Sequence, residues 1–293
     1  MQKSFFFFFI IILVFSCNIR KPQQMNHITY LNKVNEIDSI YRMNNDTVTA
    51  VEMYQKLFKI YPPHNSYLIE EYQNYIKLSD KYHFDFGGKE SLYKLIPLVA
   101  PNWKYNRMDK GFFALYKKYG IDSIEVENKV AEWQKGLNKR LIDSFSIAFF
   151  RNEEFRTPIY NSKLQNLNDA KNAKLLIWTF KNYGFPSLQR IGLLGNNDIF
   201  MPMGNLLNHM ADEEQYQYFK EKILKYVKTG ECVPIDYAAL IDKRAYSEGR
   251  ECDYGTFNDL SISDSIRVNK NRRKIGMPSL KHSRKIHNDY FKH

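Results

Sequence analysis

Three residues in the C-terminal half of the chain carry side chains that could do chemistry together: His209, Asp212 and Asp242. His209 and Asp212 are three positions apart, so on one helix their Cβ atoms would lie about 5–6 Å from each other. With Asp242 from a later helix, they could form a histidine–carboxylate metal site, or a general base held in place by a carboxylate. Spacing alone is weak evidence for a metal site.

Each of these residues also has a structural interpretation, and these interpretations are the better supported. Asp212 can cap the helix that follows it. His209, on the flank of a buried helix, is more often a satisfied interior histidine than a ligand. Asp242 can neutralise Lys243 or Arg244. On a helical wheel Arg244 points into the apolar side of its helix, where a charge needs a partner.

We therefore expect His209, Asp212, Asp242 and Tyr254 to form one hydrogen-bonded cluster, where three helices meet a turn. Short connections make neighbouring helices antiparallel, which brings the required helix ends to one side. Glycine allows a positive φ in such a turn, and the neighbouring hydroxyls can bond to the backbone. The residues of this polar cluster are His209, Asp212, Asp242, Lys243, Arg244, Tyr254, Gly255 and Thr256.

The helices that must position the cluster have clear ends between residues 199 and 256. A first helix would begin at Pro202 and a second at Asp212, because proline suits the first helical position and aspartate caps well. A third would begin at Pro234. Glycines mark the ends of the last two helices: Gly230 and Gly249.

An ordered series of short motifs runs through the same half of the chain. The central motifs are His209-Met210-Ala211-Asp212, Leu240-Ile241-Asp242-Lys243, Gly249 and Tyr254-Gly255-Thr256. The flanking ones are Asn152-Glu153-Glu154-Phe155-Arg156, Tyr183-Gly184-Phe185-Pro186 with Gly192, and Val268 to Met277. Over about residues 140–280 this order of motifs resembles a bacterial domain family whose function is unknown. It is number 6624 among the domains of unknown function.

The chain departs from the family pattern at two places. The usual Asp-Arg pair reads Asp242-Lys243, and the usual Gln-x-Tyr-Gly-Thr-Gln reads Cys252 to Phe257. A role for those glutamines therefore does not carry over, and the resemblance implies no activity.

The first 16 residues are typical of a targeting segment. Phe5 to Phe15 is an apolar run shorter than the about 20 residues that span a bilayer. Val14-Phe15-Ser16-Cys17 resembles a bacterial lipoprotein signal, which implies cleavage before Cys17 and lipid on its sulfur; an ordinary signal peptide is the alternative. We expect a lipid-anchored protein of the bacterial cell envelope, on the outer side of the inner membrane or on the outer membrane, with residues 17–26 as a tether.

The formal net charge of +11 favours acidic partners. An envelope protein, anionic head groups or an anionic polymer would fit. Nucleic acid is excluded by the export signal and by the lack of any nucleic-acid motif. The basic residues are spread along the chain, as expected of a solubilising surface, except that 270–285 holds seven Lys or Arg and no acid.

Two further cysteines, Cys232 and Cys252, would lie in a compartment that permits disulfides. The helix expected between them is about 21 Å long, whereas bridged Cα atoms lie within about 7 Å. Free thiols are therefore expected, with a bridge as the alternative.

The N-terminal half predicts paired antiparallel helices, either a repeat-like hairpin array or a plain bundle. They are expected at 27–43, 47–60, from Ser66, around 92–99 and at 108–119, followed by one long helix over 121–150. The predicted parts are 1–16 signal, 17–26 tether, 27–139 helical-hairpin domain and 140–293 helical C-terminal domain. The fold class is all-α.

No familiar catalytic motif is present: there is no G-x-S-x-G elbow, no H-E-x-x-H and no phosphate-binding P-loop. The sequence therefore favours a helical interaction or scaffold module of the envelope, with no cofactor. The alternative is an envelope hydrolase, or another enzyme, that uses His209, Asp212 and Asp242.

Overall fold

A computed structural model describes residues 26–66, 68–107, 110–156, 160–212, 214–257 and 262–291. In these ranges the regular elements are helices, and the one β-type pairing is an isolated bridge between Leu194 and Phe200. The all-α fold class predicted from the sequence is therefore confirmed. The predicted signal, most of the tether and Cys17 lie outside the described residues.

The N-terminal helices pack as consecutive neighbours, α1 on α2, α2 on α3 and α3 on α4. This arrangement follows from short connections, which turn each helix back along the previous one. Their bounds are α1 His27–Asn44, α2 Thr47–Ile60, α3 Glu71–Lys81, α4 Gly88–Val99, η1 Ala100–Asn102, α5 Trp103–Asn106, α6 Lys110–Lys118 and α7 Ser123–Lys135.

The C-terminal helices surround a second group of buried side chains, with α11 and α12 both against α13. The bounds are α8 Lys139–Glu153, α9 Ser162–Asn182, α10 Leu188–Ile191, η2 Asn196–Asp198, α11 Met203–Asn208, η3 His209–Ala211, α12 Tyr216–Thr229, α13 Pro234–Ser247, α14 Ser265–Lys274 and α15 Leu280–Tyr290.

The single long helix expected over 121–150 is wrong, because the chain breaks there into α7 and α8. Gly136 follows the last turn of α7, where glycine is a poor helix former. The side chain of Asn138 then accepts a hydrogen bond from the backbone N–H of Leu141 (3.0 Å) and caps α8. The cap at Asn138 therefore divides the helix, although the apolar residues on either side of it keep a helical spacing.

The helix expected from Ser66 begins five residues later, at Glu71. Asn65 provides the capping side chain: its Oδ1 accepts from the backbone N–H of Tyr72 (3.2 Å) and of Gln73 (3.3 Å). The Ser66 hydroxyl instead donates to the buried Glu71 carboxylate (2.9 Å). Asn65 and Ser66 therefore lie ahead of α3 and hold its first turn with their side chains.

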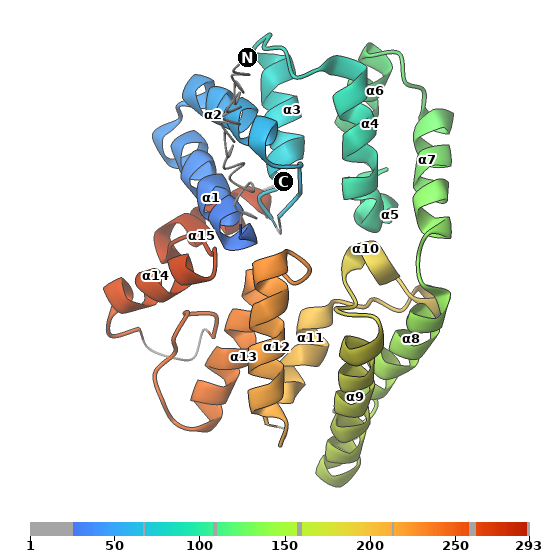
Figure 1. Ribbon diagram of the computed structural model, residues 1–293, viewed down its shortest axis with the longest axis vertical. Coiled ribbons are helices and arrows are strands. Elements are labelled where there is room, and N and C mark those ends of the chain that lie inside the picture. Colours follow the sequence, from blue (N-terminus) through green and yellow to red (C-terminus); the bar gives the residue numbers. More distant parts are fainter. Residues whose placement is uncertain are drawn as a thin grey trace, which may run out of the picture.

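The helices follow one another around a ring, and the last one returns to the first (Figure 1). The buried apolar side chains form two cores that divide near residue 139. Ile286 of α15, however, packs in the N-terminal core, and Ile28 of α1 packs in the C-terminal one. Helices α1 and α15 therefore join the two halves.

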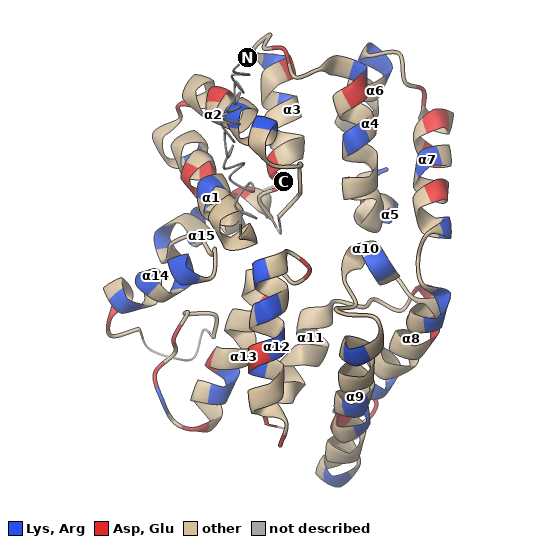
Figure 2. Ribbon diagram, viewed as in Figure 1, with Lys and Arg blue, Asp and Glu red and all other residues tan. Residues whose placement is uncertain are grey.

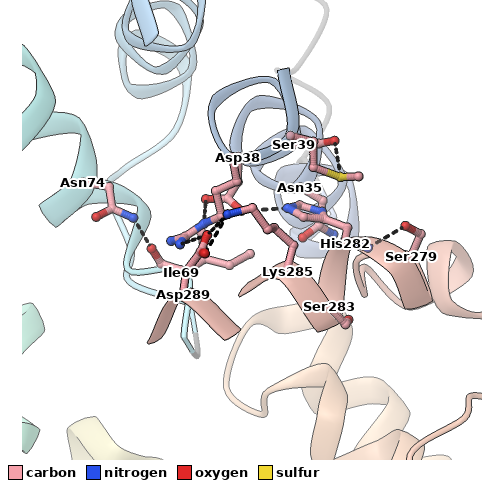
Figure 3. Close-up of polar contacts among 12 residues, drawn as sticks. Asn35, Asp38, Ser39, Ile69, Asn74, Ser279, His282, Ser283, Lys285 and Asp289 are labelled. Carbon is pink, nitrogen blue, oxygen red and sulfur yellow. Dashed lines mark hydrogen bonds and ion pairs between the residues drawn. The ribbon is translucent and has the colours of Figure 1, made fainter. Parts of the chain in front are cut away.

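A polar network with a buried centre, here named the α1–α15 clasp, fixes this closure (Figure 3). His282 Nε2 lies 2.7 Å from Asp38 Oδ2, and both side chains are buried. Arg42 Nε donates to both oxygens of Asp38, at 2.9 and 3.0 Å, and Arg42 Nη1 lies 3.3 Å from Asp289 Oδ2. The clasp consists of Asp38, Arg42, His282 and Asp289.

Candidate functional site

Asp242 on α13 is completely buried, with 0% of its surface exposed. Its carboxylate accepts hydrogen bonds from the backbone N–H groups of Asp253 (2.7 Å) and Tyr254 (2.9 Å). Its other oxygen accepts from both the backbone N–H (2.8 Å) and the hydroxyl (2.7 Å) of Thr256. Asp242 thus holds residues 253–256 against α13, and a buried carboxylate with four donors is well satisfied.

The predicted turn at Tyr254-Gly255-Thr256 is present, and its glycine is required. Gly255 has φ +66°, and a Cβ at this position would lie 2.9 Å from Ile262 and 3.0 Å from Leu280. The sequence predicts a bond from the hydroxyl of Thr256 to the backbone. The hydroxyl instead donates to the Asp242 carboxylate. The turn is therefore shaped by a side chain from a neighbouring helix.

Arg272 on α14 continues this arrangement, although the sequence analysis did not single it out. It is 3% exposed, and it donates to the backbone carbonyls of Pro278 (2.6 Å) and Tyr254 (2.7 Å) and to the Ser283 hydroxyl. Burial lowers the pKa of Arg272 to about 10, while the charge of Asp242 acts in the opposite direction. Asp242, the turn and Arg272 together form what we call the Asp242–Arg272 junction, which ties α13 to α14 and α15.

His209, Asp212 and Lys243 form a separate polar group. Lys243 Nζ lies 3.5 Å from His209 Nδ1 and 3.2 Å from Asp212 Oδ2. The Ser247 hydroxyl donates to the other oxygen of Asp212 (2.9 Å). We call this set the Lys243 group.

The expectation of one cluster containing His209, Asp212, Asp242 and Tyr254 is therefore wrong. Asp242 and Lys243 are consecutive on α13, so their side chains point about 100° apart around the helix axis. Asp242 faces the turn, and Lys243 faces His209 of η3 and Asp212. The two side chains serve different contacts, although they belong to one sequence motif.

Two finer expectations also need correction. Asp212 does not cap the next helix, because α12 begins at Tyr216 and the Asp212 carboxylate bonds to Lys243 and Ser247 instead. Arg244 finds its acidic partner in Glu248, with Nε 2.6 Å from Oε1, and not in Asp242.

The electrostatic environment of His209 keeps its imidazole neutral at pH 7. Burial is the main cause that lowers its pKa to about 3, and the cations Arg156 and Lys243 lower it further, whereas Asp212 raises it. Arg156 is itself paired with Asp169, with Nη2 2.6 Å from Oδ1. A base with so low a pKa is a weak proton acceptor at neutral pH, which counts against general-base catalysis by His209.

Arg156 is a second residue whose place the sequence analysis missed, although it ends the upstream motif Asn152 to Arg156. The motif Asn152 to Arg156 and the motif His209 to Asp212 belong to the same family resemblance, and this shared origin could have indicated that they lie together. In the structure Arg156 follows α8, and its charge acts on His209.

Neither cysteine offers reactive chemistry, and the described residues contain no candidate metal centre. Cys232 and Cys252 are free, as expected; both are also buried, and burial raises the pKa of both thiols. Within the described ranges no three His, Cys, Asp or Glu residues are grouped so that they could hold a metal ion.

Comparison with known proteins gives no match to a family model, to a curated protein or to a solved structure. The resemblance to domain family 6624 therefore stays a prediction from motifs.

The depressed pKa of His209 predicts how this residue affects stability at low pH. The unfolded chain binds a proton near pH 6.5, whereas the folded chain does so only near pH 3, so His209 lowers stability as pH falls through this window. Between pH 7 and 4 the His209→Gln variant should lose about 3 kcal/mol less stability than the parent chain. Urea unfolding at a series of pH values measures this difference, and parallel curves would contradict it.

Proposed function

We propose that the protein is a lipid-anchored helical interaction module of the bacterial cell envelope. The observation that carries this proposal is that the buried Asp242 carboxylate already accepts four hydrogen bonds from residues 253–256. A reaction centre built on His209, Asp212 and Asp242 would require the Asp242 carboxylate to leave the four donors of residues 253–256. Because those groups would then be buried without partners, such a rearrangement is costly.

The surface supports a binding role for acidic partners. Lys and Arg residues occur on helices in both halves of the ring (Figure 2). On α14, Lys270, Arg273 and Lys274 are exposed, while Arg272 points inward to the Asp242–Arg272 junction. An envelope protein or an anionic polymer would meet exposed positive charge there.

The attachment to a membrane would be made by the lipid. Of the described helices, none has the length and apolarity needed to cross a bilayer. Nine residues, 18–26, lie between Cys17 and α1, and with Cys17 they make up the predicted tether. A chain attached at Cys17 would thus place the helical ring next to the membrane surface.

Replacing Cys17 by serine tests the anchor and the interaction together. The parent chain should be processed and found in the membrane fraction, and cross-linking before detergent solubilisation should recover an envelope partner with it. The Cys17→Ser variant should leave the membrane fraction and recover less partner, because anchoring raises the local concentration. If the parent chain recovers nothing beyond what an unrelated lipoprotein of similar abundance recovers, the interaction function fails. If the variant is still cleaved and membrane-bound, the lipid anchor fails.

A further inference from the structure

A cavity of about 880 Å³ lies between the two halves of the ring. Its walls come from α1, the loop before α3, the link between α12 and α13, the Gly255–Thr256 turn and the α14–α15 pair. This volume is within the range of about 300–1,000 Å³ typical of small-molecule sites. The cavity is built where segments far apart in the sequence meet.

The charge of the lining is one-sided. The described lining residues include two arginines and three histidines, and they include no aspartate or glutamate. Arg272 is engaged in the Asp242–Arg272 junction, but Arg284 on α15 is exposed and forms no hydrogen bond or ion pair with a described residue. The cavity therefore offers one uncommitted cation to an anionic group.

Neutral donors accompany this cation. Asn65 uses its Oδ1 to cap α3, which leaves its side-chain NH2 without a partner in the described part of the chain. The rings of His27 and His64 contact each other, with centroids 5.2 Å apart, and burial lowers the pKa of both. Both imidazoles are thus neutral at pH 7, and each has an N–H group to donate.

The rest of the lining is largely apolar. It includes Leu31, Ile69, Ile235, Met277, Leu280 and Ile286. Side chains of this kind bind hydrocarbon and exclude a small fully hydrated anion.

We propose that this cavity binds a small amphiphile with an anionic head, either a carboxylate or a phosphate, and an apolar body. The first lining residue, His27, comes directly after the tether, which at full extension spans about 35 Å for ten residues. A membrane as the source of the ligand rests on the proposed lipid anchor, whereas binding itself does not.

The test uses the processed full chain in phosphatidylcholine nanodiscs, with empty nanodiscs subtracted, and equilibrium dialysis against four probes. Octanoate and octyl phosphate should bind. Neutral octyl glucoside and inorganic phosphate should each bind about tenfold more weakly than the better octyl anion, because each lacks one half of the recognition. A preference for octyl phosphate over octanoate would indicate a phospholipid-like ligand, and the reverse preference a fatty-acid-like one.

Two matched variants distinguish binding of the anion by Arg284 in the cavity from a general effect of positive charge on α15. Arg284→Gln should weaken binding of the preferred octyl anion about tenfold, since it removes the uncommitted cation. Lys281→Gln, also exposed on α15 but lining a different hollow with Arg42 and Lys285, should bind like the parent chain. Equal binding by the two variants, or octyl glucoside binding as tightly as the anions, would overturn the proposal. If the parent chain binds neither octyl anion but still recovers envelope partners, the proposed ligand is refuted and the proposed interaction function is not.

Discussion

Replacing Asp242 by alanine is expected to lower the free energy of unfolding by about 3–5 kcal/mol, the cost typical of removing one partner from a buried charged arrangement. The change leaves the backbone N–H groups of Asp253, Tyr254 and Thr256, and the Thr256 hydroxyl, without their acceptor. It also leaves the buried guanidinium of Arg272 without the nearby negative charge. Thermal and urea unfolding of the variant measure the loss.

Asp253→Ala is the matched control. The Asp253 carboxylate lies in the same turn but forms a partly exposed ion pair with Arg267, with 3.0 Å between Oδ1 and Nη1. Such pairs contribute about 0–1 kcal/mol, so this variant should unfold almost like the parent chain. If Asp242→Ala is no more destabilised than Asp253→Ala, the Asp242–Arg272 junction does not hold the C-terminal helices.

The second large effect is expected at the α1–α15 clasp. Asp38→Ala leaves His282 and Arg42 without the carboxylate that both contact, in a site where Asp38 is 0% exposed. We expect a loss of about 3–5 kcal/mol. Because α15 is held to α1 by this network, trypsin should also cleave α15 faster, at Lys281, Arg284 or Lys285.

The proteolysis result distinguishes local release of α15 from general instability. Asp289→Ala removes the partly exposed carboxylate that contacts Arg42 and Lys285, and it should cost at most about 1 kcal/mol. A variant of the C-terminal core away from α15, Phe145→Ala on α8, should lose similar stability without faster cleavage at the α15 sites. Unchanged cleavage of α15 in Asp38→Ala would show that apolar packing, and not the clasp, holds this helix.

The helix ends were the most predictable part of the fold. Pro234 begins α13, Gly230 ends α12, and Gly249 follows the end of α13, as the sequence indicated. These positions depend on local backbone chemistry, which a few consecutive residues determine. Where a local signal was weaker, as at Asn138, the apolar stripe suggested a continuous helix and the boundary was missed.

The candidate site was predicted by residue type but not by pairing. Asp242 and the glycine of the turn were identified, yet the partner of Arg244 and the direction of Lys243 were not, because helix periodicity gives a side chain's direction only to within a wide sector. The clasp was missed altogether. A signal existed in Asp38, which lies one helical turn after the buried Val34 and so required a partner, but the sequence did not indicate that one of its two partners would be the distant His282.

The meeting of α1 and α15 also determines the order in which the protein can be assembled. Asp38 and His282 are 244 positions apart, so at synthesis rates of about 5–20 residues per second the first helix waits about 12–50 s for its final neighbour to be made. Throughout that interval α1 lacks the contact of Ile286, and its buried carboxylate lacks one of its two partners. Removing only the last helix would therefore leave α1, at the beginning of the chain, without its final neighbour, so the effect of such a truncation would reach both ends of the sequence.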